Sequence, residues 1–237
     1  MRFKLYFDLE NEEVPIQYRR CILSFFKLSL SEYSEEDYRK FYADKDPIIK
    51  PYTFSTYFRN LKIDKESVIV KEKKFEINVS VVDCETAIIL YNAFNNQRYK
   101  KFSIDKNSWT LKNIEMLNEK KVVSDEIIIK FQSPLCVRKS VDGKDYYFSY
   151  GDDKFQEVLK INIQEQLKIT DFPKEIVDTF SITPMDTRKM IVKFYEKSME
   201  CSTGIFKISG DRNLLEYLYK TGIGSRHSAG FGMFQIM

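Results

Sequence analysis

The chain has 237 residues, enough for one large domain or for two domains of about 110 to 120 residues each. Hydrophobic residues make up 43% of it and charged residues 31%, a balance that excludes a disordered or low-complexity polypeptide. The formal net charge is only +3, from 38 basic and 35 acidic residues, so any basic surface that binds nucleic acid must be local.

The cysteines and the apolar runs indicate where the chain resides. The four cysteines lie far apart and form no CxxC pair, which argues against a disulfide scaffold and a zinc site and favours a reducing compartment. No run approaches about 18 apolar residues, and charges interrupt the first apolar stretch, so neither a membrane span nor a signal peptide is indicated. We therefore expect a cytoplasmic protein with no cofactor and no membrane partner.

The first half of the chain predicts an α/β domain. Apolar and polar residues alternate over 2–9 as a half-buried strand requires, and after Pro15 apolar residues recur at three- to four-residue steps, as in a helix. A second short helix is expected at Ser34, where Ser34 and Asp37 form a capping-box-like pair. The predicted elements follow the order β-α-β-β-α-β: strand 2–9, the helix after Pro15, strand 52–58, a strand pair across 67–82, a helix from Asp83 and a returning strand at 99–104.

The same order of elements recurs in the second half. The stretch 109–123 is polar and irregular in pattern, and it predicts a junction between an N-terminal domain, 1–123, and a C-terminal domain, 124–237. The elements expected beyond it are strand 126–131, a hairpin over 135–150 turning at Asp142 and Gly143, helix 154–167, strands 190–195 and 204–208, helix 211–219 and strand 231–236. The predicted fold class is therefore α+β, with two tandem ferredoxin-like βαββαβ domains.

Half of the eight glycines fall in one eleven-residue window near the end of the sequence: Gly222, Gly224, Gly230 and Gly232. The same window holds Ser225, Arg226, Ser228 and the only histidine, His227. Its spacing fits neither a Walker loop, nor a dinucleotide fingerprint, nor a GxSxG elbow. Because glycines permit positive φ and close approach of a ligand, the window predicts a loop that binds an anion through backbone N–H groups and polar side chains. The alternative is a helix C-cap followed by a tight turn.

The segment from Gly222 to Phe234 resembles the C-terminal glycine-rich loop of the CRISPR-associated (Cas) endoribonucleases that process precursor CRISPR RNA. Three further features carry the resemblance: the total length, Ser133-Pro134-Leu135-Cys136-Val137-Arg138 and Tyr52-Thr53-Phe54-Ser55. It implies two ferredoxin-like domains related to RNA-recognition motifs, a role in antiviral defence, and CRISPR repeat RNA as the partner. The cleaved product would be a guide RNA for a CRISPR effector complex. That complex and a second copy of the chain are further candidate partners.

The chemistry that the resemblance implies needs no metal. A ribose 2′-hydroxyl attacks the adjacent phosphate and leaves a 2′,3′-cyclic phosphate and a 5′-hydroxyl, so the protein must supply a base, an acid and positive charge. Many family members place a catalytic histidine after the first helix, where this chain has Phe41-Tyr42-Ala43-Asp44-Lys45, and some relatives carry one in the hairpin, where it has Lys139-Ser140. The catalytic candidates are therefore His227, Tyr42, Lys45 and Ser140. The RNA-binding candidates are Gly222, Gly224, Ser225, Arg226, Ser228, Gly230, Arg138, Lys139 and Lys50.

Two alternatives remain open, and a third is set aside. A relative that binds repeat RNA without cutting it fits the missing histidine. An ordinary RNA-recognition protein fits the run Ala229 to Phe234, although that module's signature has a basic residue where Ala229 stands. Metal-dependent chemistry would use the acidic run Glu35-Glu36-Asp37, but its position at a helix start suits the helix dipole, and no metal site is assigned.

Overall fold

The computed structural model describes residues 1–42, 48–64 and 66–237. Their contacts divide the chain into two compact units. The first comprises Met1–Pro51, Thr56–Asn118 and Lys193–Glu196, and the second comprises Tyr52–Ser55, Glu119–Val192 and Lys197–Met237. Two short segments thus group with the unit formed mainly by the other half of the sequence. The helices of the described residues include none with the length and apolar character to cross a membrane.

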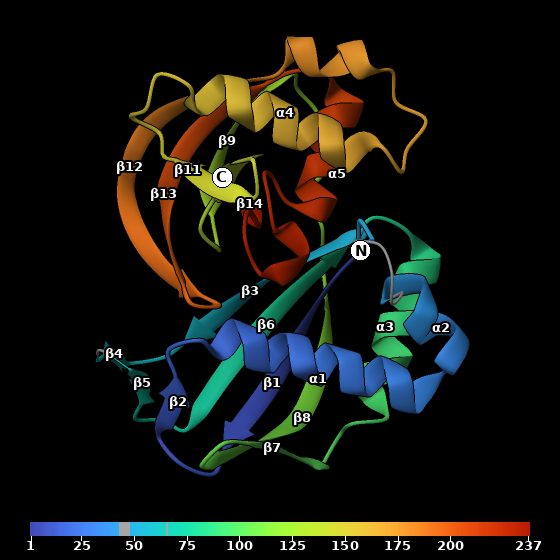
Figure 1. Cartoon of the computed structure of the whole chain (residues 1–237). Helices are drawn as coiled ribbons and strands as arrows, with labels where there is room; N and C mark the ends of the chain where they lie inside the picture. Colours follow the sequence, from blue (N-terminus) through green and yellow to red (C-terminus); the bar gives the residue numbers. More distant parts are fainter. Residues whose placement is uncertain (43–47, 65) are drawn as a thin grey trace. The chain divides into compact units, whose positions relative to one another are not determined.

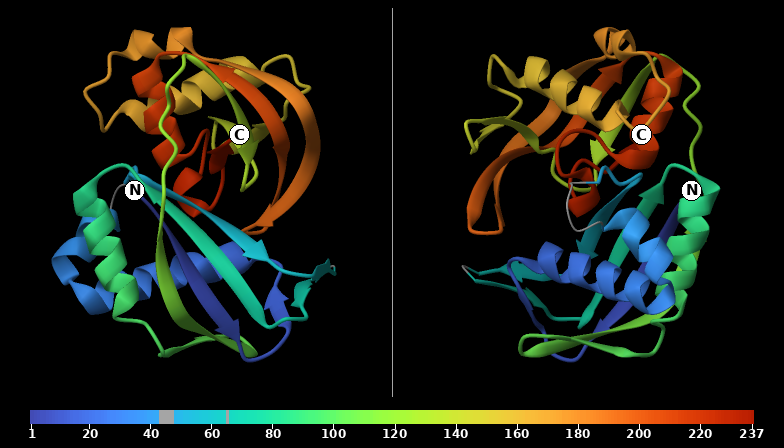
Figure 2. Two further views of the ribbon diagram at one scale, coloured as in Figure 1. Left: turned by 180° about the vertical axis from the view of Figure 1, so that it is seen from behind. Right: turned by 45° about the vertical axis from the view of Figure 1, so that its right-hand side comes forward.

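The main sheet of the first unit has the strand order β3-β6-β1-β8-β7 (Figure 1). Its strands are β1 (Arg2–Leu9), β3 (Tyr52–Phe58), β6 (Lys74–Val81), β7 (Lys101–Ile104) and β8 (Asn107–Leu117). The central strand β1 is antiparallel to both β6 and β8. Two helices, α1 (Tyr18–Tyr33) and α3 (Cys84–Asn95), lie on one face of this sheet (Figures 1 and 2). The chain order β1-α1-β3-β6-α3-β8 in this strand order is the ferredoxin-like arrangement.

Aromatic side chains form the core between this sheet and its helices. The alternation in β1 buries Phe3, Leu5 and Phe7, as the sequence predicted. The Phe7 ring stacks on Phe75 of β6 with ring centroids 4.8 Å apart, and it meets the edge of Phe25 of α1 at 5.2 Å. Such pairs each add about 0.5–1.5 kcal/mol beyond the burial of their area, so they fix α1 onto the sheet.

Two smaller features complete the first unit. A sheet with the order β2-β5-β4 joins β2 (Glu13–Pro15), β4 (Leu61–Ile63) and β5 (Ser67–Val70). The short helix α2 (Glu35–Phe41) follows α1, and the Ser34 hydroxyl accepts a hydrogen bond from the Asp37 amide at 3.1 Å. The predicted cap at Ser34 is therefore confirmed.

The prediction of a junction over 109–123 was wrong for most of that stretch. Residues 107–117 form β8, which lies beside β1 and is the last strand of the ferredoxin-like order. The predicted returning strand at 99–104 is instead the short edge strand β7, which pairs with β8. The pattern misled because β8 exposes several polar side chains, and because a bulge opposite Tyr6 and Phe7 breaks the alternation.

The second unit repeats the ferredoxin-like order with an added hairpin. Its sheet has the strand order β12-β13-β9-β14 and joins β9 (Glu126–Phe131), β12 (Ser181–Phe194), β13 (Lys197–Ser209) and β14 (Phe234–Ile236). The helices are α4 (Phe155–Leu167) and α5 (Arg212–Thr221), with short 3-10 turns at Lys174–Thr179 and His227–Ala229. Strands β10 (Val137–Val141) and β11 (Lys144–Phe148) form a separate hairpin between β9 and α4. Asp142 and Gly143, both at positive φ, make its turn as predicted.

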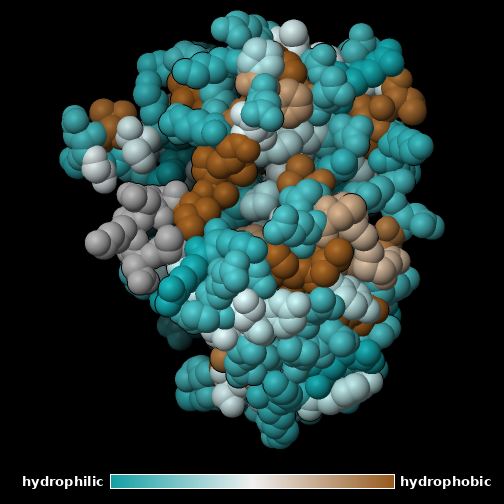
Figure 3. Space-filling model, turned by 90° about the vertical axis from the view of Figure 1, so that its right-hand side faces the viewer, coloured by the Kyte–Doolittle hydropathy of each residue, from teal (hydrophilic) through white to brown (hydrophobic). Residues whose placement is uncertain are grey.

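Several strand lengths in this unit differ from the prediction. The strands expected at 190–195 and 204–208 are parts of β12 and β13, which are much longer. Most side chains of β12 are exposed, so the strand lacks the apolar alternation by which its length is recognised. The final strand begins at Phe234 rather than 231, because the three residues before it belong to a buried loop. Hydrophilic residues cover most of the face shown in Figure 3, with hydrophobic groups among them.

Candidate nucleic-acid interface

The glycine-rich segment between α5 and β14 packs inward. Its amide groups are used inside the protein: Gly224 donates to the Gln166 side chain at 3.2 Å, Ser225 to the Cys136 carbonyl at 2.8 Å and Gly232 to the Pro134 carbonyl at 2.8 Å. All four glycines are buried, whereas Ser225, Arg226, Ser228 and Ala229 are half-buried. The expected open cradle of glycine N–H groups is therefore corrected, because the amides of all four glycines bond within the protein.

Close packing explains why glycine is needed in this loop. A Cβ atom on Gly230 would lie 2.5 Å from the Phe54 ring, and one on Gly224 would lie 2.7 Å from the Cys136 carbonyl oxygen. Both residues have positive φ, at 83° and 89°. The clustered glycines thus let the loop press against Phe54 and Cys136, which belong to the same unit as the loop.

A carboxylate surrounded by three cations lies beside this loop. Asp145 of β11 pairs with Arg138 of β10 at 2.9 Å, with Lys197 of β13 at 2.7 Å and with Arg226 of the loop at 3.4 Å. The hydroxyls of Ser140 and Tyr147 also donate to Asp145, and Arg138 donates to the Ser225 hydroxyl at 3.3 Å. We call Arg138, Asp145, Lys197 and Arg226 the Asp145 cluster.

The charges of the Asp145 cluster do not cancel. Hydrogen bonds from Lys197 and Ser140, with the nearby Arg138 charge, hold the pKa of Asp145 well below its usual range, so the carboxylate is ionised at neutral pH. Three cations and one carboxylate leave a net charge of about two positive units, by the ordinary ionisation of these residue types. The Asp145 side chain is 8% exposed, whereas Arg138, Arg226 and Lys197 are 32%, 24% and 51% exposed. Such a site attracts an anion.

The register of the hairpin decides which predicted residues join this cluster. Arg138 lies opposite Tyr147 and Ser140 opposite Asp145, so these side chains share one face of the hairpin. Lys139 lies opposite Tyr146 on the other face and is exposed. The structure thus brings Arg138, Ser140, Ser225 and Arg226 together and places Lys139 apart from them.

Two side-chain amides of α4 hold the cationic segments in place. Asn162 bonds both peptide groups of Arg138: its Oδ1 accepts from the Arg138 amide at 2.9 Å, and its Nδ2 donates to the Arg138 carbonyl at 2.7 Å. One turn further on, Gln166 donates to the Gly222 carbonyl at 3.1 Å and accepts from the Gly224 amide. These side-chain amides bond to backbone groups as a neighbouring strand would. They thereby fix the positions of β10 and the loop relative to α4.

The single histidine belongs to the framework of the loop. His227 is 7% exposed, and its Nδ1 lies 3.1 Å from the Tyr52 carbonyl oxygen. The His227 carbonyl in turn accepts a hydrogen bond from the Thr53 hydroxyl at 3.0 Å. The segment Tyr52-Thr53-Phe54-Ser55 is thus the surface on which the loop packs.

A second group of predicted residues lies in the first unit. The ring of Tyr42 has the Lys50 ammonium 4.8 Å and the Lys27 ammonium 5.1 Å from its centroid, and Tyr38 stacks on it at 5.4 Å. Burial lowers the pKa of Lys50, and the neighbouring Lys27 cation lowers it further. We call Tyr42, Lys27 and Lys50 the Tyr42 cluster. The third residue predicted here, Lys45, lies outside the described residues.

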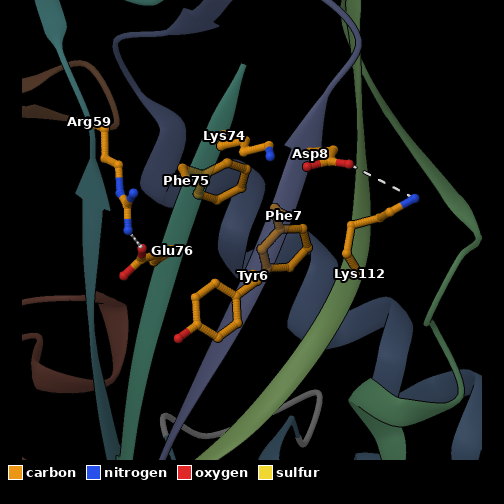
Figure 4. A pocket seen from close by; sticks show the side chains of 8 residues that line it. All are labelled: Tyr6, Phe7, Asp8, Arg59, Lys74, Phe75, Glu76 and Lys112. Carbon is orange, nitrogen blue, oxygen red and sulfur yellow. Dashed lines mark hydrogen bonds and ion pairs between the residues drawn. The ribbon is translucent and has the colours of Figure 1, made fainter. Parts of the chain in front are cut away.

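The first unit also has a pocket of about 430 Å³ on its main sheet (Figure 4). Tyr6 lies between two ion pairs in this view, Arg59 with Glu76 at 3.0 Å and Lys112 with Asp8 at 3.9 Å. Glu76 also pairs with Lys4 at 3.1 Å, so these ion pairs join three cations to two carboxylates and leave a smaller excess of positive charge than the Asp145 cluster. The Asp145 cluster is the better candidate for phosphate.

Sequence reasoning missed several residues of these clusters: Asp145, Lys197, Asn162, Gln166 and Lys27. Asp145 carries a usable signal, since a carboxylate five residues from Ser140 across a predicted two-residue turn faces it in the hairpin. Lys197 is separated from Asp145 by 52 residues and joins it only through the packing of β13. No local pattern marks it.

Comparison with known proteins identifies the family. Residues 117–236 match the family model described as CRISPR associated protein Cas6, C-terminal, which covers half of the chain. The chain belongs to the Cas6 family. A relative from Methanocaldococcus jannaschii, named CRISPR-associated endoribonuclease Cas6 1, is 30% identical over 113 residues. The match covers 45% of this chain and 43% of the relative, so this chain spans less than half of the relative's length.

Solved structures show that the Cas6-like fold extends over the whole chain. The solved structure described for a Cas6-related gene from Pyrococcus furiosus has a TM-score of 0.87 and 19% sequence identity. The match covers 100% of this chain and 98% of that chain. A second, titled as an RAMP protein binding different RNA substrates, has a TM-score of 0.83 at 16% identity and covers 100% and 99%. At these identities the likeness concerns the fold, and it confirms the predicted tandem ferredoxin-like architecture.

Proposed function

We propose that this chain binds CRISPR repeat RNA and cleaves it once, without a metal ion, to mature precursor CRISPR RNA into guide RNA. The Asp145 cluster is the observation that carries the proposal, because three strands or loops bring cations to one site with excess positive charge. Side chains of this kind bind phosphodiester groups through charge-assisted hydrogen bonds. The M. jannaschii relative, named as an endoribonuclease, supports the reaction class.

The Tyr42 cluster supports the chemical step. In that step the ribose 2′-oxygen forms a bond to phosphorus and the bond from phosphorus to the 5′-oxygen breaks. A base takes the 2′-hydroxyl proton and an acid delivers a proton to the 5′-oxygen. We assign Lys27 and Lys50 the stabilisation of charge on the phosphate and Tyr42 the orientation of the attacking hydroxyl. A lysine with a lowered pKa is also suited to proton transfer nearer to neutral pH.

Binding without cleavage is the second candidate function. The burial of His227 against the Tyr52 carbonyl favours it, because a buried framework histidine is poorly placed to transfer protons with RNA.

Incubation of the protein with labelled CRISPR repeat RNA in EDTA separates the two candidates. One discrete cut with a 2′,3′-cyclic phosphate end is expected. A gel shift without a cut assigns the chain to the binding class, and equal affinity for repeat RNA and shuffled RNA contradicts repeat recognition altogether.

A further inference from the structure

Asp145 occupies an unexpected place for an acidic residue. It lies at the centre of the surface that we assign to an anionic ligand, and simple electrostatics predicts that a carboxylate there weakens binding. Yet its side chain is 8% exposed, and its two oxygens are shared among Arg138, Lys197 and Arg226. The carboxylate is thus nearly enclosed beneath cations that reach solvent.

Each of the three cations comes from a different part of the unit. Arg138 is on β10, Lys197 begins β13 and Arg226 is in the loop after α5. Cations gathered at one point repel each other, and long basic side chains lose conformational entropy when they are held still. The ion pairs with Asp145 oppose both effects before any ligand arrives.

We propose that Asp145 is a positioning residue that preassembles Arg138, Lys197 and Arg226 into one site for a single phosphodiester of the RNA. The inference rests on the proposed function and adds a selectivity device to it. A fixed set of donors recognises one phosphate geometry, whereas the same cations on freely moving side chains bind any RNA backbone. The negative charge therefore weakens general RNA binding slightly and strengthens recognition of the correct RNA.

Asp145→Asn with Asp142→Asn as its matched control tests the proposal. Both substitutions remove one negative charge from the same hairpin, but Asp142 is an exposed turn residue at positive φ, a conformation that asparagine tolerates well. Affinities for a CRISPR repeat RNA and for a shuffled RNA of equal length are measured at several salt concentrations. We expect Asp145→Asn to weaken repeat binding by roughly tenfold and to leave shuffled RNA unchanged or slightly tighter. Asp142→Asn should tighten both by less than about threefold.

Two further variants guard against misfolding and against a purely structural role. Asp145→Glu keeps the charge and should retain repeat affinity within about threefold of wild type. Ser140→Ala removes one hydrogen bond to Asp145 at an exposed strand position and should weaken repeat binding by about two- to fivefold with the fold intact. It replaces Asp145→Asn if that variant does not fold.

The outcomes test the proposed function and the positioning role of Asp145 separately. If wild-type protein binds repeat and shuffled RNA equally, the proposed function fails. If wild type prefers the repeat and Asp145→Asn, or Ser140→Ala in its place, keeps that preference in full, the positioning role is overturned while the proposed function stands.

Discussion

The Asp145 and Tyr42 clusters both gather cations, but the group at the centre differs. Around Asp145, three basic side chains surround an ionised carboxylate that forms an ion pair with each of them. Around Tyr42, two ammonium groups flank an aromatic ring, and burial lowers the pKa of Lys50. Cations held in place by a carboxylate suit a site that binds phosphate. A buried lysine with a lowered pKa and no paired carboxylate in its cluster suits a site that takes part in the reaction. The two clusters should therefore separate binding from cleavage.

The largest effect is expected from Lys50→Met. It removes one cation of the Tyr42 cluster, and we expect the single-turnover cleavage rate to fall about 100-fold or more while repeat affinity changes by less than about threefold. Lys62→Met, at an exposed lysine of the small sheet in the same unit, should leave the rate unchanged. If Lys50→Met lowers the affinity as much as the rate, Lys50 acts in RNA binding and the two clusters do not separate binding from cleavage.

Arg138→Ala should show the opposite behaviour. Loss of its guanidinium from the Asp145 cluster should weaken repeat binding by about 10- to 30-fold and lower the salt dependence by about one counterion. Cleavage at saturating protein should change by less than about threefold, since the charge acts in binding. Lys139→Ala is the control, because the neighbouring lysine faces the other side of the hairpin. If Lys139→Ala weakens binding as much, RNA binding does not depend specifically on the face of the hairpin that carries Asp145.

His227 should behave as part of the framework of the loop between α5 and β14. Removing its ring in His227→Ala should lower the free energy of unfolding by about 1–3 kcal/mol, because the Tyr52 carbonyl and the packed loop lose a buried partner. The cleavage rate of the folded variant should fall by less than about tenfold. A rate loss of about 100-fold or more with unchanged stability would restore the histidine as an acid or base.

The fold was predictable because most of its elements carry local signals. The alternation in β1, the cap at Ser34 and the Asp142-Gly143 turn each have the periodicity or turn chemistry that their structure requires. β8 and most of β12 escaped recognition because a bulge or a run of exposed side chains breaks their alternation, so their pairing depends on neighbouring strands. The extent of those strands is determined by pairing with strands that are distant in the sequence.

The site was predictable only where its residues adjoin a motif. Arg138 follows the Ser-Pro segment and Arg226 lies among the glycines, so sequence alone singled out both. The role of the glycines was mistaken because positive φ serves close packing as well as ligand approach, and a sequence does not tell which. Lys197 and Gln166 reach the site through β13 and α4, and their long-range contacts leave no pattern along the chain.

The smallest predicted effect concerns acid stability and the carboxylate at the centre of the comparison. Because the folded-state pKa of Asp145 is depressed, its stabilisation is complete above the ordinary value of 3.8 and is lost as pH falls from there through the lower folded value. At pH 7, Asp145→Asn should lower the free energy of unfolding by about 1–2 kcal/mol, reduced by the solvent exposure of the cations. Urea unfolding at pH 7 and near pH 2 should show the gap between variant and wild type narrowing in acid. A gap of equal size at both pH values would mean that packing, and not the charge of Asp145, stabilises the Asp145 cluster.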